Sequence, residues 1–494
     1  MHPAVIPAPA ELTFLPASFA ITPTTRLLAA PGIAATHLAA LLRRSTGHAL
    51  PLETGDADRG TIALTLDGPA DLGEEGYLLD VDDLGVRLRA HTDEGLFRGV
   101  QTLRQLLPAA LERGEPQPGP WNIPGVRLED RPRFAWRGIM LDVARHFFGV
   151  EEVKRLIDLV VPYKINVLHL HLTDDQGWRL AIDGWPRLAH YGGGSEVCGG
   201  SGGFYTKADY SEIVRYAAER YLTVVPEIDL PGHTNAALAS YPELNSDGVA
   251  PDRYTGIEVG FSSLSTGEEI TYRFIDEVLG EVAALTPGPY LHIGGDEAQA
   301  TDPAEYTRFI QRVERIVRAH GKEMVGWQEI ASAPLTHGTV AQHWRPARGS
   351  APDVEARTLV DAVRSGARIV MSPAQHTYLD LKYDQGSRLG HDWAGTLEAR
   401  QSYEWDPATL LDGVGEDDVL GVEAALWTET ITSWDDITYM TLPRLMGIAE
   451  RGWSPATGRS WDEYASRLAA HAPRWTAGNL NFHRSPEVPW PTAD

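Results

Sequence analysis

The sequence predicts an α/β protein: a (β/α)8 TIM barrel preceded by a smaller N-terminal α/β domain. Two observations predict this fold. Eight apolar runs of strand length follow one another from Arg137 onward, and each ends in a polar or aromatic cluster. Segments with helical periodicity separate most of these runs. The length of 494 residues allows one large and one small domain, which we place at residues 131–494 and 1–130.

In the N-terminal domain, helices and strands of ordinary length are expected. Helices are predicted at Ala34–Arg44 and, after a cap at Thr92 or Asp93, along the apolar stripe from Leu96 to Leu106, which stops before Pro108. Strands are predicted at Thr61–Leu66 and in a hairpin of Tyr77–Val81 with Val86–Ala90. The segment Glu112–Pro120 is rich in proline and glycine, so we expect it to be the linker between the domains.

The barrel strands are expected in eight runs: Gly138–Asp142, Val167–Asp174, Leu222–Asp229, Tyr290–Asp296, Glu323–Trp327, Thr339–Trp344, Arg368–Ser372 and Gly421–Trp427. Helices are expected at Glu151–Tyr163, Glu268–Leu285, Pro303–His320 and Asp353–Gly366. Between the fifth and sixth runs, Ala331–Gly338 is too short and proline-broken for a proper helix, which predicts one degenerate unit. A doubly wound α/β sheet is the competing architecture.

The active site of such a barrel lies at the C-terminal ends of its strands, so polar chemistry should gather there. It does: the predicted ends carry Asp142 to Arg145, Asp174 with Asp175, Asp229 to His233, Asp296 with Glu297, Trp327, Trp344, Tyr378 with Asp380, and Trp427 with Glu429. The sequence therefore predicts one mouth built from all eight strands.

Asp296 and Glu297 are the most informative residues of this set. They follow the apolar strand residues and two glycines, Gly294 and Gly295, whose backbone freedom lets neighbouring acids reach one substrate. A carboxylate pair at one reacting centre is typical of enzymes that break glycosidic bonds. Tryptophans at strand ends suit the flat C–H faces of sugars, and an arginine among acids suits sugar hydroxyls. The plain alternative is an acidic pair that caps a helix or holds an arginine.

Two other functions compete with glycoside hydrolysis. A metal-dependent amidohydrolase-type barrel would use ligands such as His169, His171, His233 and His292. His169 and His171 precede the strand end by several residues, so we interpret them as hydrogen-bonded packing residues and expect no metal and no cofactor. A non-enzymatic sugar-binding module is the other alternative, but it would not need an acid beside a second carboxylate.

The charge and composition of the chain disfavour some classes of binding partner. The net charge of −25 and a pI of about 5.1 disfavour nucleic acid and anionic membranes. The N-terminal residues lack the pattern of a signal peptide, and no window is apolar enough for a transmembrane helix. We therefore expect a cytoplasmic protein, or a secreted one whose signal has been removed. The single cysteine, Cys198, excludes an intrachain disulfide.

Five motifs in chain order resemble one family. They are Arg145-His-Phe-Phe, the ten residues from His169 to Trp178 (HLHLTDDQGW), Asp229-Leu-Pro-Gly-His233, His292-Ile-Gly-Gly-Asp-Glu297 and Leu426-Trp-Thr-Glu429. Together they resemble the family-20 glycoside hydrolases, the β-N-acetylhexosaminidases, and in particular bacterial, streptomycete-like members. The likeness spans the barrel, and the small N-terminal domain also fits the plan of the family.

This resemblance implies an exo-acting enzyme that degrades chitin or glycans by removing terminal β-linked N-acetylglucosamine or N-acetylgalactosamine. It implies substrate-assisted retention, in which the 2-acetamido group is the nucleophile. Glu297 would be the acid/base, Asp296 the stabiliser of the acetamido group, and Tyr378 the group that binds its oxygen. Asp174 and His233 would support Glu297. The implied sugar-binding residues are Arg145, Trp327, Trp344, Asp380, Trp393, Trp427 and Glu429.

Overall fold

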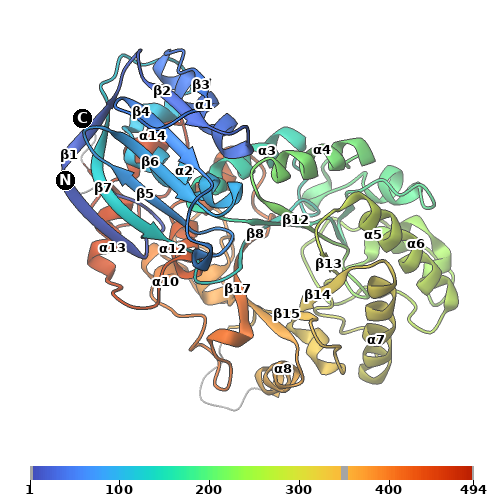
Figure 1. The fold of residues 1–494 in the computed structure, drawn as a ribbon. Coiled ribbons are helices and arrows are strands. Elements are labelled where there is room, and N and C mark those ends of the chain that lie inside the picture. The colour runs from blue at the N-terminus through green and yellow to red at the C-terminus, as the bar shows by residue number, and fades with distance from the viewer. Residues whose placement is uncertain (1–3, 347–353, 492–494) are drawn as a thin grey trace.

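The computed structural model describes residues 4–346 and 354–491. They form a seven-stranded sheet domain and a closed eight-stranded parallel barrel, which lie side by side in Figure 1. The barrel strands are β8 (Trp136–Asp142), β9 (Val167–His171), β12 (Thr223–Glu227), β13 (Tyr290–His292), β14 (Glu323–Trp327), β15 (Val340–His343), β16 (Arg368–Met371) and β17 (Val419–Leu426). The predicted TIM barrel is thus confirmed, and each expected run overlaps one of its strands.

The helices around the barrel follow the sequence pattern. They include α3 (Val150–Val160), α4 (Lys207–Ala218), α6 (Glu269–Leu285), α7 (Pro303–Ala319) and α8 (Val354–Arg364), and Asp353, where the last was expected to begin, lies outside the described residues. Between β14 and β15 the chain forms only the 3-10 segment η7 (Gln328–Ser332), as the degenerate unit predicted. Among the described residues, no helix is long and apolar enough to span a bilayer.

The N-terminal sheet has the order β1-β7-β5-β6-β4-β2-β3. Its strands are β1 (Glu11–Ile21), β2 (Arg26–Ala29), β3 (Leu52–Glu53), β4 (Thr61–Thr65), β5 (Tyr77–Val81), β6 (Gly85–Ala90) and β7 (Trp121–Asp130). The helices α1 (Ile33–Thr46) and α2 (Asp93–Leu106) pack together, and the Thr92 side chain accepts a hydrogen bond from the Gly95 N–H, so Thr92 caps α2. The predicted hairpin is β5 paired antiparallel with β6.

The prediction that Glu112–Pro120 links the two domains is wrong. The segment overlaps the 3-10 turn η2 (Ala109–Arg113) and leads into β7, which lies between β1 and β5 in the N-terminal sheet and pairs antiparallel with both. Proline and glycine therefore mark a connection inside one domain here. The short passage between Asp130 and Trp136 joins the sheet to the barrel.

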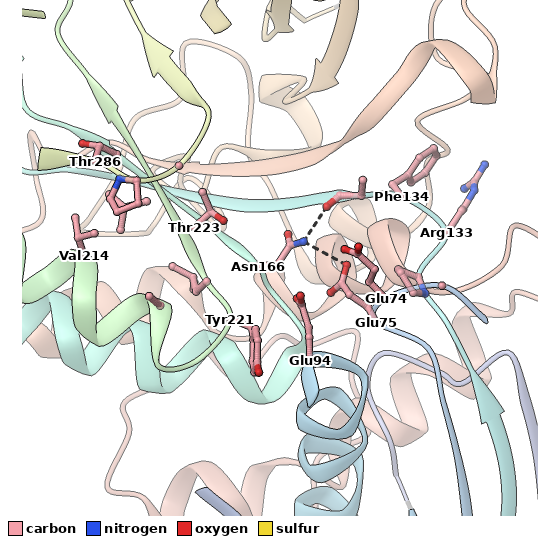
Figure 2. A pocket seen from close by; sticks show the side chains of 18 of the residues that line it. Glu74, Glu75, Glu94, Arg133, Phe134, Asn166, Val214, Tyr221, Thr223 and Thr286 are labelled. Atoms are coloured by element: carbon pink, nitrogen blue, oxygen red, sulfur yellow. Dashed lines mark hydrogen bonds between the residues drawn. The ribbon is translucent and has the colours of Figure 1, made fainter. Parts of the chain in front are cut away.

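A cavity of about 800 Å³ lies where the sheet domain meets the N-terminal end of the barrel (Figure 2). Glu74, Glu75, Glu94, Asn166 and Tyr221 are among its lining residues. Two of its carboxylates are bound by arginines: Glu75 accepts hydrogen bonds from Arg98 and Arg137, and Glu94 accepts one from Arg98 at 2.6 Å. We call this cavity the junction cavity.

The last helices of the described chain return to its beginning, so both ends lie on the same side of the molecule (Figure 1). These helices are α12 (Arg444–Trp453), α13 (Trp461–Ala469) and α14 (Ala472–Ala477). Ser454, Arg467 and His471 make hydrogen bonds to the carbonyl groups of Ala8, Val5 and Ala4 at 2.6, 2.9 and 3.0 Å. This terminal seam ties residues separated by more than 440 positions.

Candidate active site

A pocket of about 300 Å³ opens at the C-terminal ends of the barrel strands. Ten of the twelve side chains proposed from the sequence line it: Arg145, His233, Asp296, Glu297, Trp344, Tyr378, Asp380, Trp393, Trp427 and Glu429. The remaining two, Asp174 and Trp327, lie directly behind the lining and contact it. Residues from seven chain segments thus meet at one mouth.

The local backbone explains how two neighbouring acids reach this pocket. Strand β13 ends at His292, and Gly294 and Gly295 follow with φ of 65° and 97°, the left-handed region that glycine tolerates. A Cβ on Gly294 would lie 1.7 Å from Asp229 Oδ1, so only glycine fits. Glu297 itself has a φ of 45°, which is costly for a side chain with a Cβ. The chain accepts this conformation where it turns Asp296 and Glu297 to the same side.

His233 connects the acid pair to the charges behind it. Its Nε2 lies 3.5 Å from both Asp296 Oδ2 and Glu297 Oε2, and its Nδ1 lies 3.2 Å from Asp174 Oδ1. Burial alone would lower the pKa of His233, but Asp174 and Asp296 raise it well above its usual value. The imidazole is therefore a buried cation that faces both acids of the pair.

Asp174 is the anion that balances this cation. Its Oδ2 contacts Arg145 Nη2 at 2.8 Å and His171 Nε2 at 2.9 Å. Burial would raise the pKa of Asp174, but Arg145 and His233 hold it well below its usual range. Asp174 does not line the pocket, so its effect on the pocket passes through His233 and Arg145.

The surroundings of Asp296 favour its protonated form. Burial raises its pKa to about 7, the nearby Glu329 and Glu297 add to this rise, and His233 opposes it. With a pKa of about 7, Asp296 is partly protonated near neutral pH. A ligand that donates a hydrogen bond or carries positive charge at this position would favour its ionised form.

Aromatic side chains form one wall of the pocket. Trp344 and Tyr378 lie nearly parallel, with ring centroids 6.3 Å apart and an interplanar angle of 15°. Trp427 lies 6.2 Å from Tyr378, and Trp327 packs behind Trp427 at 5.7 Å, only 1% exposed. Trp393 stands edge-on to Trp344 at the rim and is 50% exposed. Burial, with Asp380 and Asp296 nearby, raises the pKa of Tyr378 well above its usual value, so its hydroxyl keeps its proton.

Polar atoms at the inner end of the pocket have no hydrogen-bond partner among the described residues. They are Arg145 Nε, Asp296 Oδ1, Asp380 Oδ1 and Glu429 Oε2, all buried. The Arg145 guanidinium lies 4.8 Å from the Trp427 ring, and Asp142 fixes it from behind at 3.3 Å. Burial and Glu429 raise the pKa of Asp380 well above its usual value. These atoms can exchange hydrogen bonds with the hydroxyl groups of a bound sugar.

The barrel histidines form a hydrogen-bonded network beneath the pocket, as the packing interpretation expected. His169 contacts Glu423 at 2.8 Å and Glu227 at 2.9 Å, His292 contacts Glu227 at 3.1 Å, and His171 joins Glu227 to Asp174. Among the described residues, four sets have ligand atoms close enough for a cation; two of them include His233, and the others centre on His169 with His292 and on His171. Within these sets, His171 Nε2 lies 2.9 Å from Asp174 Oδ2 and His233 Nδ1 lies 3.2 Å from Asp174 Oδ1.

Sequence reasoning missed several neighbours of the site. Ile257, Val259, Arg345, Pro346 and His391 also line the pocket. Ile257 and Val259 belong to a long connection without periodicity, so no pattern pointed to them. Arg345 is adjacent to Trp344, and its basic side chain beside a predicted wall residue was the one available signal. Glu329 was also missed; it lies behind Trp344 and binds it.

Two family models match the chain. The model described as glycosyl hydrolase family 20, catalytic domain, matches residues 134–456, and the model described as glycosyl hydrolase family 20, domain 2, matches residues 2–131. Together they cover both the barrel and the N-terminal sheet. These matches favour the glycosidase interpretation of the mouth over the amidohydrolase alternative.

Relatives and solved structures agree with these models. A β-N-acetylhexosaminidase of Cellulomonas fimi is 44% identical over 99% of this chain and 97% of its own. The family-20 β-N-acetylhexosaminidase of Streptomyces coelicolor A3(2) superposes with a TM-score of 0.96 at 54% identity and covers 99% of both chains. A mutant β-hexosaminidase of Streptomyces plicatus, solved in complex with its product GlcNAc, has the same TM-score and identity over 99% of this chain and 98% of its own.

Proposed function

The chain belongs to glycosyl hydrolase family 20 and is a glycoside hydrolase of the β-N-acetylhexosaminidase type, and we propose that it acts by substrate-assisted retaining catalysis on terminal non-reducing β-linked residues. One observation carries the mechanism: Asp296 and Glu297 approach the same nitrogen, His233 Nε2, at 3.5 Å each. The two acids are also neighbours in the chain, an arrangement that does not easily place their carboxyl groups on opposite sides of one bond. Direct double displacement needs two carboxyls on opposite sides of the bond, about 5 Å apart.

In the first step, the carbonyl oxygen of the 2-acetamido group attacks the anomeric carbon. The bond from this carbon to the leaving oxygen breaks, and Glu297 gives its proton to that oxygen. The product is a bicyclic oxazolinium ion on the sugar. Asp296 accepts a hydrogen bond from the acetamido N–H and stabilises the positive charge, while the Tyr378 hydroxyl donates to the acetamido oxygen.

In the second step, Glu297 takes a proton from water, and the water oxygen attacks the anomeric carbon from the side of the departed group. The bond to the acetamido oxygen breaks, and the sugar leaves with its configuration retained. An internal nucleophile avoids the entropy of recruiting an external one. His233, held by Asp174, lies 3.5 Å from Glu297 Oε2 and positions this carboxyl group for both steps.

The other pocket residues hold the sugar. Trp344 and Trp427 surround the acetamido methyl group, with Trp327 supporting Trp427 from behind. Arg145, Asp380 and Glu429 bind the ring hydroxyls through the buried atoms that lack protein partners. Trp393, half exposed at the rim, stacks on the sugar of the leaving group. The GlcNAc complex of the Streptomyces plicatus relative supports a carbohydrate in this position.

The mechanism is tested by comparing aryl 2-acetamido glycosides with the matching 2-hydroxy glycosides. We expect the enzyme to cleave the first with retained configuration and to leave the second almost untouched. Asp296→Asn keeps the volume of the side chain but removes its charge, and should lower kcat by about 10²–10³-fold, the usual effect of losing one electrostatic stabiliser. A thiazoline mimic of the bicyclic intermediate should bind much more tightly than the product sugar.

A covalent glycosyl-enzyme intermediate would contradict the mechanism. A 2-fluoro glycoside traps enzymes that use a carboxylate nucleophile. If mass spectrometry found a glycosyl ester on Asp296, the carboxylate would be the nucleophile and the substrate-assisted mechanism would be wrong. Paired N-acetylglucosaminide and N-acetylgalactosaminide substrates would then define which ring the pocket prefers under either mechanism.

A further inference from the structure

Glu329 is a carboxylate beside the pocket that the proposed mechanism does not use. It belongs to η7, the short 3-10 segment that takes the place of a helix in the degenerate unit. Its side chain is 16% exposed, and it does not line the pocket of the acid pair. A partly buried carboxylate requires partners that offset its desolvation.

Its two oxygens bind two neighbours from the loop after β15. Trp344 Nε1 donates to Glu329 Oε2 at 3.0 Å. Arg345 donates to Glu329 Oε1 from Nη2 at 2.8 Å and from Nε at 3.2 Å. The Arg345 guanidinium also lies 4.9 Å from the Trp344 ring. One carboxylate therefore fixes both side chains relative to each other.

The preceding residue, Gln328, fastens the same loop. Its Oε1 accepts hydrogen bonds from the backbone N–H of Trp344 at 3.3 Å and lies 2.7 Å from His343 Nδ1. The missing helix thus leaves a compact turn whose polar side chains hold the next strand end. The position of Trp344 in turn affects the pocket wall, because its ring stacks on Tyr378 and stands edge-on to Trp393.

We propose that Glu329 is a positioning residue that fixes the indole of Trp344, and with it the size of the space for the N-acyl group of the substrate. The inference rests on the proposed function, because it takes Trp344 to be a wall of the acetamido pocket. Without the carboxylate, the buried indole N–H has no acceptor and Arg345 loses a bidentate partner. The indole of Trp344 can then turn, and the pocket can accommodate longer acyl groups.

Glu329 also acts on the charge balance of the pocket. Burial raises the pKa of Asp296 to about 7, and Glu329 adds to that rise. The charged or titratable groups that face Asp296 are His233, Glu227, Asp229, Glu297, Tyr306, Tyr378 and Glu329. Replacing Glu329 by a neutral side chain removes one negative charge from this set, so the pKa of Asp296 should fall. A merely structural residue would not produce this change.

The experiment compares kcat/KM for aryl glycosides whose 2-amino group carries acetyl, propionyl or butyryl. One methylene in a tight apolar pocket changes such rates by about 10–200-fold, so the intact protein should favour acetyl strongly. Glu329→Ala should lower the ratio of kcat/KM for the acetyl substrate to kcat/KM for the butyryl substrate by about tenfold or more. The matched control is Glu404→Ala, which removes another carboxylate–arginine pair, with Arg400 at 2.7 Å, on the surface and outside the pocket lining.

Glu329→Gln provides the second variant, since it preserves volume and a carbonyl acceptor for Trp344 but not the charge that binds Arg345. It should narrow the acyl ratio less than Glu329→Ala, and should move the acid limb of the pH profile of kcat/KM to lower pH. If thermal melting shows folded variants whose acyl ratio and acid limb equal those of the intact protein, the proposal is wrong. An equal loss for all three acyl groups would also overturn it. The preference of the intact enzyme for 2-acetamido over 2-hydroxy glycosides tests the mechanism separately.

Discussion

The two ends of the barrel each carry a cavity lined by acids, arginines and aromatic residues, yet they differ in how the charges are used. In the junction cavity, the carboxylates of Glu75 and Glu94 are bound by Arg98 and Arg137. At the mouth, buried atoms such as Arg145 Nε and Asp380 Oδ1 have no hydrogen-bond partner among the described residues. The junction cavity is the larger, at about 800 Å³ against about 300 Å³.

This difference shows why volume alone does not identify a site. Paired charges at the junction stabilise the contact between the sheet domain and the barrel, as does the fully buried pair of Lys164 with Asp130 at 2.7 Å. Unpaired groups at the mouth instead cost stability in the free protein, because they are desolvated without compensation. Such a cost is typical of groups that are completed by a ligand. Mutations at the two ends should therefore have different kinds of effect.

The largest effect is expected for Glu297→Gln at the mouth. It removes the proton donor, so kcat on substrates with poor leaving groups should fall by about 10²–10⁴-fold, the usual contribution of general acid–base catalysis. Activated aryl substrates need little protonation and should lose much less in the glycosylation step. Steady-state kinetics on both substrate classes, with thermal melting as the folding control, measures the difference. Equal losses on both classes would assign Glu297 a structural role.

At the junction, Arg137→Ala should act on stability instead. Arg137 is fully buried and binds Glu75, so its loss leaves a buried carboxylate short of a partner. We expect the free energy of unfolding to fall by about 3–5 kcal/mol, the typical penalty for breaking a buried ion pair. Denaturant unfolding measures this change. The folded fraction should keep its kcat/KM. If the variant instead lost activity at unchanged stability, the junction would affect catalysis, and the proposed difference between the two ends of the barrel would be wrong.

A smaller effect is expected from pH at the mouth. If Asp296 works as an anion and burial raises its pKa to about 7, protonation below that pH removes the active form. The value of kcat/KM should then rise with pH through about 7, changing about tenfold per unit below it. Asp296→Asn should abolish this acid limb while leaving the limb of any other group in place. A limb that persists in the variant would belong to another residue.

The smallest effect is expected from metal removal. The histidines and acids under the mouth are bound to one another, and the proposed mechanism needs no cation. Exhaustive chelation should therefore leave kcat/KM unchanged. A loss that zinc restores would show that one of the four possible cation sets is occupied and would reopen the amidohydrolase alternative.

The sequence predicted the barrel well because its strands are separate apolar runs with polar ends. Eight of them could be located, and the proline-broken segment after β14 correctly marked the unit without a helix. The linker prediction failed because it was based on amino-acid composition alone. Glu112–Pro120 has the proline and glycine content of a linker, but the pairing of β7 with β1 and β5 shows that the segment lies inside the sheet domain. Local sequence does not record strand pairing over a long distance.

The same distinction applies to the site. Strand-end position pointed to nine residues that line the pocket, because the barrel brings all such ends together, and the family resemblance added Trp393. It did not point to Glu329, whose importance depends on the direction of one hydrogen bond to Trp344. Nor did it give the protonation of Asp296, which depends on burial and on neighbours from other strands. Both properties arise only from packing.

The terminal seam bears on how the protein is made. Residues 4–8 are synthesised more than 440 positions before their hydrogen-bond partners Ser454, Arg467 and His471. At about 5–20 residues per second, the wait is on the order of tens of seconds. During this time the segment of residues 4–8 has none of these three partners and stays exposed to chaperones and proteases. Synthesis of the last of the three partners is the event that allows the seam to form.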